Sequence, residues 1–178
     1  MYENLELSGG ILYLSRTNGS LTALLQEDLN LISGNATITG GNGPCNLIIN
    51  GNYNQTGGSL FFHNNSAEPT SGIIYATIHG NFSNDSGNIT FDNNISSTAR
   101  HRLSLNGNSF TLAGNAAINS NVMANHPMYG IIYFDQDGVM NYHSYNNTST
   151  IKNIKQEIND NCTLKVVDGD MLTSESIR

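Results

Sequence analysis

Residues 47–65 read LIINGNYNQTGGSLFFHNN, and residues 76–94 read ATIHGNFSNDSGNITFDNN, so nearly the same phrase is written twice. In both copies a glycine precedes an aromatic residue, and a second glycine follows seven residues after the first. An apolar residue and a phenylalanine then lead into paired asparagines. This repeat decides the fold, because self-similarity at a period of about 20–50 residues marks solenoids, propellers or repeat arrays.

The phrase extends into a template with an apolar residue five positions before a glycine and apolar residues two and four positions after it. The glycines are Gly10, Gly34, Gly58, Gly87, Gly114, Gly138 and, more weakly, Gly169, spaced by 24, 24, 29, 27, 24 and 31. The position five before holds Leu5, Leu29, Tyr53, Phe82, Ser109 (with Phe110 serving in its place), Tyr133 and Leu164. The position two after holds Leu12, Ala36, Leu60, Ile89, Ala116, Met140 and Met171. The position four after holds Leu14, Ile38, Phe62, Phe91, Ile118, Tyr142 and Thr173.

These columns predict short strands that stack on one another. Apolar residues two apart lie on one face of a strand, and a repeat of two dozen residues is too short to bury that face alone. A propeller blade needs about 40 residues, and no repeat shows the spacing of an amphipathic helix. We therefore predict an all-β fold, a right-handed single-stranded parallel β-helix of about seven rungs, as one segment over residues 1–178. Phe62 and Phe91 should stack inside it, with Leu60 and Ile89 beside them.

One segment favours a helix instead. Between Thr150 and Asp160, the side chains of Ile151, Ile154 and Ile158 share a helical face, and Ser149 can cap the start. The pattern predicts a short helix near residues 150–160, lying over the rungs.

Composition limits the function classes. The chain has 178 residues, 38% hydrophobic and 12% charged, with 7 Lys and Arg against 14 Asp and Glu and a net charge of −7. That balance argues against nucleic acid as a partner, and no stretch reaches the ~20 apolar residues needed for membrane insertion. Met1 is not followed by a signal segment. The chain is then either cytoplasmic or an internal piece of a longer exported chain, and the ending Ser174–Arg178 favours a piece.

Several polar positions have a structural and a functional interpretation. The column five residues after each glycine should face solvent or a loop, and it holds Ser15, Thr39, His63, Asp92, Asn119 and His143. Three rungs separate His63 from His143, about 14 Å, which is too far for a shared metal. The asparagines seven residues after a glycine, Asn65, Asn94 and Asn121, favour a hydrogen-bonded ladder over a strip that binds glycan.

The remaining motifs are weaker. The segment Arg100–Arg102, which contains His101, is the only basic cluster and is interpreted as a solvated loop. Residues 135–138, DQDG, resemble the start of a calcium loop but lack its later ligands, so a turn is favoured there and also at residues 168–170. Cys45 and Cys162 fall four rungs apart, beyond the ~7 Å limit between Cα atoms of a disulfide, which predicts two free thiols.

Catalysis on polysaccharides would need two or three carboxylates, or carboxylates with Arg or Lys, on one face. Asp85, Asp92, Asp135 and Asp137 occupy different columns or turns, and no Ser/His/Asp set or phosphate loop stands out. We therefore expect no catalytic, cofactor-binding or metal-binding residues, and no enzyme.

The phrase at Gly51–Leu60 resembles the repeats of secreted bacterial surface proteins, both autotransporter passengers and proteins exported by the type IX system. The stretch from Gly130 to Phe134 and on to Gly169 is similar to the type IX kind in particular. A fainter likeness links Phe62–Asn65 and Phe91–Asn94 to repeats of chlamydial surface proteins. The resemblance covers the chain from about Leu29 onward and implies a β-helix in an extracellular or cell-surface location. It carries over no catalytic residue, and the signal peptide and sorting domain of the family would lie outside this segment.

Three hypotheses follow. The favoured one is a non-catalytic structural or adhesive β-helical segment, a stalk or adhesive passenger, whose partners are glycans or host or matrix surfaces and the flanking rungs of the same chain. The alternative is a polysaccharide-binding or polysaccharide-degrading β-helix, a lyase or hydrolase, by analogy of fold alone. A third, an intracellular assembly protein, rests on the absent signal segment.

Overall fold

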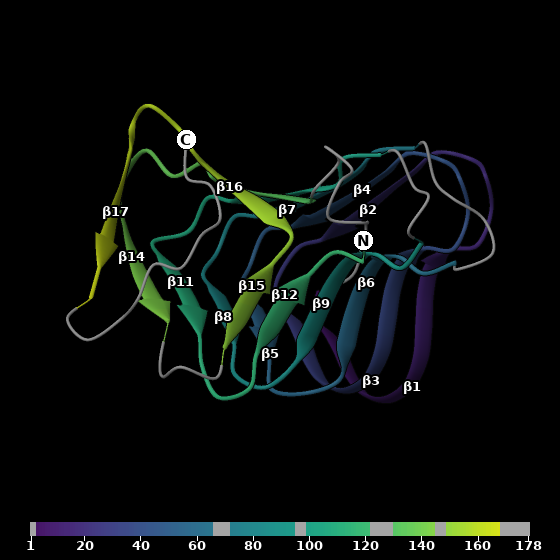
Figure 1. Cartoon of the computed structure of the whole chain (residues 1–178). Coiled ribbons are helices and arrows are strands. Elements are labelled where there is room, and N and C mark those ends of the chain that lie inside the picture. The colour runs from purple at the N-terminus through teal and green to yellow at the C-terminus, as the bar shows by residue number, and fades with distance from the viewer. Residues whose placement is uncertain (1–2, 66–71, 95–98, 122–129, 145–148, 168–178) are drawn as a thin grey trace.

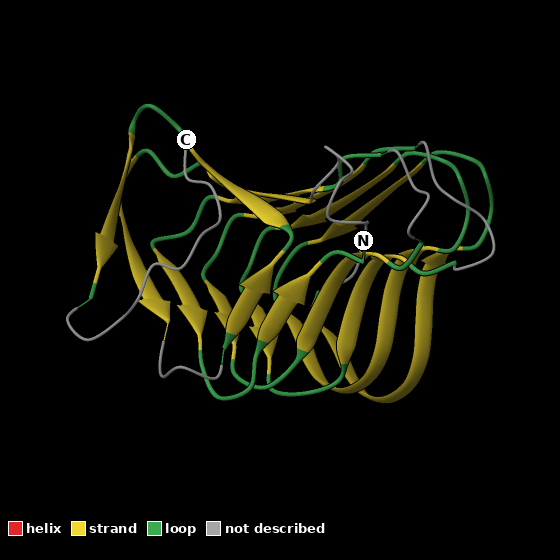
Figure 2. Cartoon of the chain, in the orientation of Figure 1, coloured by secondary structure: helices red, strands yellow, loops and turns green. Residues whose placement is uncertain are grey.

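The computed structural model describes residues 3–65, 72–94, 99–121, 130–144 and 149–167, which coil into a parallel β-solenoid (Figure 1). Every strand pairing among these residues is parallel. Figure 2 shows the described chain as strands joined by loops, without a helix. The predicted all-β class and parallel solenoid are confirmed.

Two sheets form the wall of the solenoid. The six-stranded sheet, which we call the first face, contains β2 (Leu21–Leu25), β4 (Cys45–Ile49), β7 (Ile74–Ile78), β10 (Arg102–Leu105), β13 (Gly130–Phe134) and β16 (Ile154–Ile158). The larger sheet contains β1 (Leu5–Ser15), β3 (Leu29–Thr39), β5 (Tyr53–Gln55), β6 (Ser59–His63), β8 (Phe82–Asn84), β9 (Asn88–Asp92), β11 (Ser109–Leu112), β12 (Ala117–Asn119), β14 (Gly138–Ser144), β15 (Thr150–Lys152) and β17 (Cys162–Val166).

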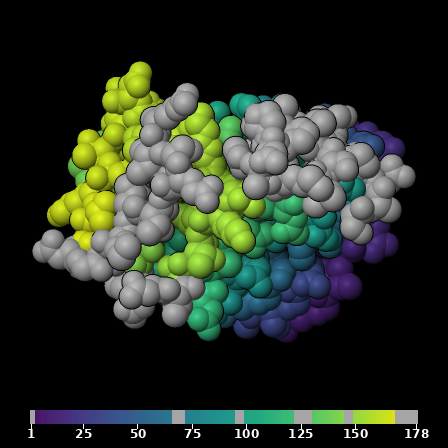
Figure 3. All heavy atoms as spheres, viewed as in Figure 1, coloured from purple at the N-terminus to yellow at the C-terminus, as the bar shows by residue number. Residues whose placement is uncertain are grey.

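The larger sheet bends along its length into two faces. The long strand β3 pairs with β5 through its first half and with β6 through its second half. The second face therefore continues from β5 through β8, β11 and β14 to β17, and the third face from β6 through β9 and β12 to β15. Each turn of the chain adds one strand to each face, and Figure 3 shows the turns as successive bands in chain order.

The solenoid has about five turns, fewer than the predicted seven or so. Counting glycines overestimates the number because the glycines do not all occupy one corner. Gly34 and Gly58 lie at the bend between the second and third faces, with φ of 84° and 66°. Gly138 instead opens β14 on the second face, and Gly169 lies outside the described residues.

The apolar register is right for the early turns and wrong for later ones. Leu29, Tyr53, Phe82 and Phe110 follow one another in adjacent strands, as the template predicts. Tyr142, however, pairs with Phe110, although the template places it in the column of Phe91. Ile118 pairs with Ile89 and not with Phe91, and Tyr133 pairs with Ser104 on the first face. The corners differ in length from turn to turn, so a register counted from each glycine slips.

The predicted helix near residues 150–160 is wrong. This stretch forms β15 and β16, with a corner at Asn153, whose φ is 57°. Within β16, Ile154 and Gln156 are buried while Lys155 between them is more exposed, which is the two-residue alternation of a strand. The three-and-four spacing of Ile151, Ile154 and Ile158 arises because two strands meet at a corner. Pairing with β12 and β13 outweighs the local helical pattern.

Aromatic rings stack along the interior. The rings of Phe62 and Phe91 lie 4.4 Å apart with planes 14° from parallel, as predicted. A second stack joins Tyr53, Phe82 and Phe110, with ring centroids 5.1 and 5.0 Å apart. All five side chains are buried. The stacks follow from the solenoid geometry, because equivalent residues of adjacent turns lie one inter-strand spacing apart.

Two further sequence expectations concern the thiols and the membrane. Cys45 and Cys162 are both free, as predicted, and Cys45 is buried. The described part of the chain contains no helix with the length and hydropathy to cross a bilayer.

We expect Gly58→Ala to lower the free energy of unfolding by at least about 1–2 kcal/mol. Gly58 has a φ of 66°, where an L-residue is strained by roughly that amount. A Cβ atom there would also overlap the backbone carbonyl oxygen of Gly34 on the preceding turn. Urea unfolding measures the loss. Gly19→Ala is the matched control, because its Cβ would meet nothing closer than 3.6 Å; equal losses would refute the corner geometry.

Candidate functional site

Three ionisable side chains meet in the interior of the solenoid, and we call His63, Asp92 and His101 the polar cluster. His63 ends β6 and Asp92 ends β9, so the two residues lie in register on adjacent turns of the third face. His101 comes just before β10 and reaches the cluster from the first face. The exposed fractions of the three residues are 0%, 1% and 1%. The cluster thus closes the corner between the third and first faces.

The Asp92 carboxylate is the centre of the cluster. Its Oδ1 lies 3.2 Å from Nδ1 of His63 and accepts the backbone N–H of Asn94 at 2.8 Å. Its Oδ2 lies 3.1 Å from Nε2 of His101. Three donors therefore surround one buried carboxylate, which is how a buried charge is made tolerable.

The hydrogen bonds assign the histidine tautomers. Nδ1 of His101 accepts the backbone N–H of Ile74 at 3.2 Å, so its proton sits on Nε2 and is donated to Asp92. His63 donates from Nδ1 to the carboxylate, so its Nε2 points away from Asp92. That Nε2 is buried and has no hydrogen-bond partner in the described part of the chain. The carboxylate thus accepts a hydrogen bond from each of the two imidazoles.

Burial and hydrogen bonding shift two pKa values in the cluster. Burial opposes ionisation of Asp92, but the hydrogen bonds from His101, His63 and the Asn94 amide outweigh it and hold its pKa well below the ordinary value. Burial lowers the pKa of His101, and the neighbouring Asp92 carboxylate only partly offsets that effect. Both shifts favour the same state, an ionised Asp92 beside a neutral His101.

Two sequence expectations fail at this site. The column five residues after each glycine should face solvent, yet Thr39, His63 and Asp92 are buried. The alternation of inward and outward side chains breaks down at the ends of β6 and β9, where the chain turns the corner and consecutive residues are buried. The basic segment around His101 is not a solvated loop either: His101 is buried, and the guanidinium of Arg102 lies 3.7 Å from the Tyr133 ring centroid.

The cluster has part of the geometry of a catalytic dyad, since a carboxylate orients a histidine as in nucleophilic catalysis. All three side chains of the cluster are, however, buried. Nor do the described residues include any group of three His, Cys, Asp or Glu side chains arranged to hold a metal ion. The hydrogen bonds of the cluster tie β6, β9 and the start of β10 together.

We expect the stability of the protein to fall as pH drops through about 6.5. His101 is harder to protonate in the folded chain than in the unfolded chain, so below its ordinary pKa of 6.5 the unfolded state binds the extra proton. The stabilisation is fully present above that pH and is lost below it. Urea unfolding at pH 8 and pH 5 measures the difference. His101→Gln should reduce this pH dependence, whereas the exposed His79→Gln should not; identical slopes in both variants would contradict the assignment.

The asparagine ladder predicted at Asn65, Asn94 and Asn121 exists with a shifted register. Asn93 donates its side-chain amide to Asn64 at 3.0 Å, and Asn121 donates to Asn93 at 2.9 Å. Asn94 reaches the backbone carbonyl of Asn65 at 3.5 Å. The ladder joins three successive turns along the corner beside the polar cluster.

A longer ladder, which sequence reasoning missed, runs along the corner between the first and second faces. The backbone N–H of Asp28 donates to the side chain of Asn4 at 2.9 Å, and that of Asn52 donates to Asp28 at 2.6 Å. The pattern continues through Asn81 and Asn108, and the Gln136 amide donates to Asn108 at 2.9 Å. The signal was present in the sequence, since an asparagine or aspartate precedes each of Leu29, Tyr53 and Phe82.

The other candidate residues named from the sequence do not belong to the polar cluster. Residues 135–137 form the turn between β13 and β14, as predicted, and Asp135 accepts a hydrogen bond from Asn159 at 2.8 Å. His143 pairs with Thr111 on the second face, so His63 and His143 lie on different faces. Asn119 pairs with Thr90, not with Asp92. The turn predicted at residues 168–170 lies outside the described residues.

Outward side chains on the first face form an aromatic and cationic strip. Tyr75 pairs with Arg102, and Arg102 pairs with Ile131 on the next turn. Tyr75 is 43% exposed, and Arg102 covers the ring of Tyr133. The strip thus combines aromatic rings with a guanidinium group on the outside of the first face.

Comparison of the chain with protein-family models, curated proteins and solved structures finds no significant match.

Proposed function

We propose that this chain is a non-catalytic structural β-solenoid, right-handed, that serves as a stalk or adhesive passenger of a secreted or cell-surface bacterial protein. The observation that carries the proposal is that the recurring polar groups of the repeat bond to one another inside the solenoid and along its corners. The polar cluster is sealed, and the Asx ladders bind one turn to the next. Such ladders stiffen a rod and offer no convergent acid and base to a substrate.

The carboxylates support the same reading. Asp92 is enclosed by three donors, Asp135 and Asp137 each accept an asparagine amide of the following turn, and Asp85 is bonded to Ser83 within its own turn. A glycosidase would place two carboxyl groups about 5–10 Å apart across an open groove. Each of these four carboxylates instead accepts a hydrogen bond from a neighbouring side chain.

Two measurements test the structural role: a screen for products released from polysaccharides, and unfolding of the chain under mechanical force. The purified chain should release no product from neutral or acidic polysaccharides, and the extended rod should unfold at high force as one cooperative unit. Product formation that is lost in Asp135→Asn or Asp137→Asn would overturn the proposal in favour of a polysaccharide-degrading enzyme.

A second candidate function is binding of glycan without catalysis, and the strip of Tyr75, Arg102 and Tyr133 favours it. Aromatic rings stack on sugar rings, and a guanidinium donates to hydroxyl or carboxylate oxygens. Glycan-array binding that Tyr75→Ala abolishes, while Tyr13→Ala at the first turn leaves it intact, would support this candidate. Equal binding by both variants would contradict a role of the strip in glycan binding.

The cell-surface location rests on the resemblance of the repeats to type IX and autotransporter passengers. It is tested by expressing the protein from its native gene and fractionating the cells. Recovery in the cytoplasm would contradict this part of the proposal and favour the intracellular assembly protein.

A further inference from the structure

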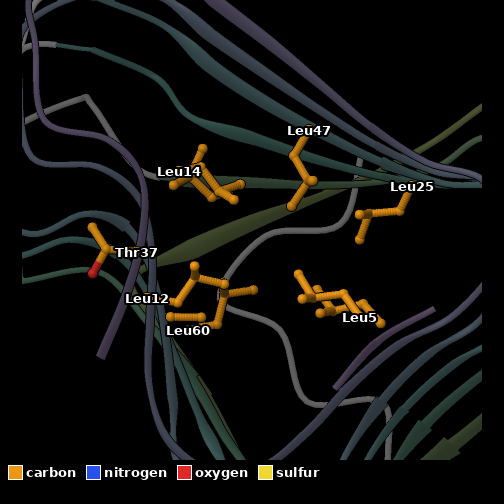
Figure 4. Close-up of a pocket in the computed structure, with 10 residues that line it drawn as sticks. Leu5, Leu12, Leu14, Leu25, Thr37, Leu47 and Leu60 are labelled. Atoms are coloured by element: carbon orange, nitrogen blue, oxygen red, sulfur yellow. The ribbon is translucent and has the colours of Figure 1, made fainter. Parts of the chain in front are cut away.

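The N-terminal end of the solenoid is an open apolar face. In the described chain β1 pairs only with β3 and β2 pairs only with β4, so each has one free edge. Behind these edges lies a hollow of about 660 Å³, lined by leucines such as Leu5, Leu12, Leu21 and Leu25. Figure 4 shows a smaller pocket that shares Leu5, Leu14 and Leu25 with this hollow and is also lined by Leu47 and Leu60.

Free strand edges of this kind are templates for pairing with another chain. The backbone N–H of Leu5 donates to Asp28 and that of Leu21 donates to Pro44, so these residues face the second turn. Because successive residues of a strand direct their backbone groups to opposite sides, the N–H groups of Asn4 and Thr22 face the free edge. An occupant must satisfy both edges and fill the hollow between them, which is what another solenoid turn does.

We propose that this end docks onto the C-terminal end of a second copy of the chain, so that copies stack head to tail. The strands β15, β16 and β17 also have one partner each in the described chain. Continuing the observed register by one turn sets apolar side chains on apolar side chains in four inward columns, whereas in a further column Ala23 would follow the polar Gln156. Column by column, Leu12 follows Ile151, Leu21 follows Ile154, Leu25 follows Ile158 and Leu5 follows Val166.

The longer Asx ladder continues across the same junction. Within the chain, each rung of the ladder is a side-chain oxygen that accepts from the following turn. Asp160 occupies the ladder position after Gln136, since Asn159 and Asn161 are bonded to Asp135 and Asp137 on either side. Its exposed carboxylate is therefore in register to accept the free N–H of Asn4 from the next copy.

Charge also favours a head-to-tail contact over a head-to-head one. Residues 3–28 carry four acidic and one basic side chain, a net charge of −3, whereas residues 149–167 carry three basic and two acidic side chains, a net charge of +1. Two N-terminal ends would repel each other, while an N-terminal end attracts a C-terminal end. Because the contact joins the two opposite ends of the solenoid, each added copy extends the same axis and leaves a free end, which produces open filaments.

The first test is the mass of the full chain against concentration by light scattering or sedimentation. We expect multiples of 19.2 kDa that grow with concentration. Thr22→Pro blocks the free edge without removing an internal hydrogen bond and should raise the dissociation constant at least about tenfold, the factor that corresponds to about 1.4 kcal/mol. Ser20→Pro, just outside β2, is the matched control and should associate like the unmodified chain. A monomer at every concentration, or equal weakening by both prolines, would overturn the proposal and leave this end to a flanking turn of a longer chain.

The second test is the direction of the contact. In a Cys162→Ser background, Asn4→Cys combined with Asp160→Cys should form covalent ladders of many copies on oxidation. Neighbouring ladder positions lie about 4.8 Å apart, within the ~4.4–6.8 Å range between Cα atoms of a disulfide. Each single cysteine variant should form no ladder. Efficient dimers from Asn4→Cys alone, or no cross-link in the double variant, would contradict head-to-tail stacking.

Discussion

Phe91→Ala is expected to lower the free energy of unfolding by about 3–5 kcal/mol, the usual cost of truncating a buried phenylalanine. Its ring is fully buried and stacks on Phe62 at 4.4 Å, and such ring pairs add about 0.5–1.5 kcal/mol beyond burial of area. The residue also lies in the middle of the solenoid, in a strand flanked by β6 and β12. Because each turn of a solenoid contacts only its neighbours, a cavity there weakens the interfaces on both sides.

Phe61→Ala is the matched control for that measurement. Phe61 lies one residue from Phe62 in β6, with its side chain on the outward, partly exposed side. Urea unfolding should show less than half the loss seen for Phe91→Ala. Equal losses would mean that the inward and outward positions of these strands are assigned wrongly.

Asp92→Ala should cost about as much, roughly 3–5 kcal/mol, for a different reason. The change leaves the donors of His63, His101 and the Asn94 amide without their acceptor in a sealed interior. Each buried donor without a partner costs about 1–3 kcal/mol. The pattern of the sequence alone predicts a small effect here, because it places Asp92 in an outward column; the structure reverses that expectation.

The controls for Asp92 separate lost hydrogen bonds from lost charge. Asp85→Ala, at an exposed position of the preceding corner, should change stability by no more than about 0.5 kcal/mol. Asp92→Asn keeps one acceptor oxygen and should fall between the two alanine variants. A loss for Asp92→Ala as small as that for Asp85→Ala would show that the polar cluster contributes nothing to holding the turns together.

The sequence predicts the fold well because equivalent residues pack against one another in every turn of a solenoid. The doubled phrase pairs Tyr53 with Phe82 and Phe62 with Phe91, and the structure stacks both pairs. The prediction weakens where the repeat does. After Phe110 the corners change length, so Tyr142 and Ile118 fall in columns other than those counted from the glycines.

The sequence alone does not predict the polar cluster, for a related reason. The repeat places His63 and Asp92 in one column, but the alternation of side chains along a strand assigns that column to the outside and does not predict the corner. His101 comes from a loop whose path no repeat position fixes, and only the fold brings it to Asp92. The helix predicted near Ile154 fails because local spacing carries no information about strand partners far away in the chain.

The claim on which the rest depends is the parallel stacking of turns in the observed register. Nuclear Overhauser contacts between aromatic side chains test it most directly, because they report pairs of rings less than about 5–6 Å apart, the range of the stacks. The account predicts cross-peaks between Phe62 and Phe91, and along the series Tyr53, Phe82 and Phe110, with Phe61 outside both sets. A cross-peak from Phe91 to Phe61 in place of Phe62, or the absence of the Phe82 contacts on either side, would contradict it.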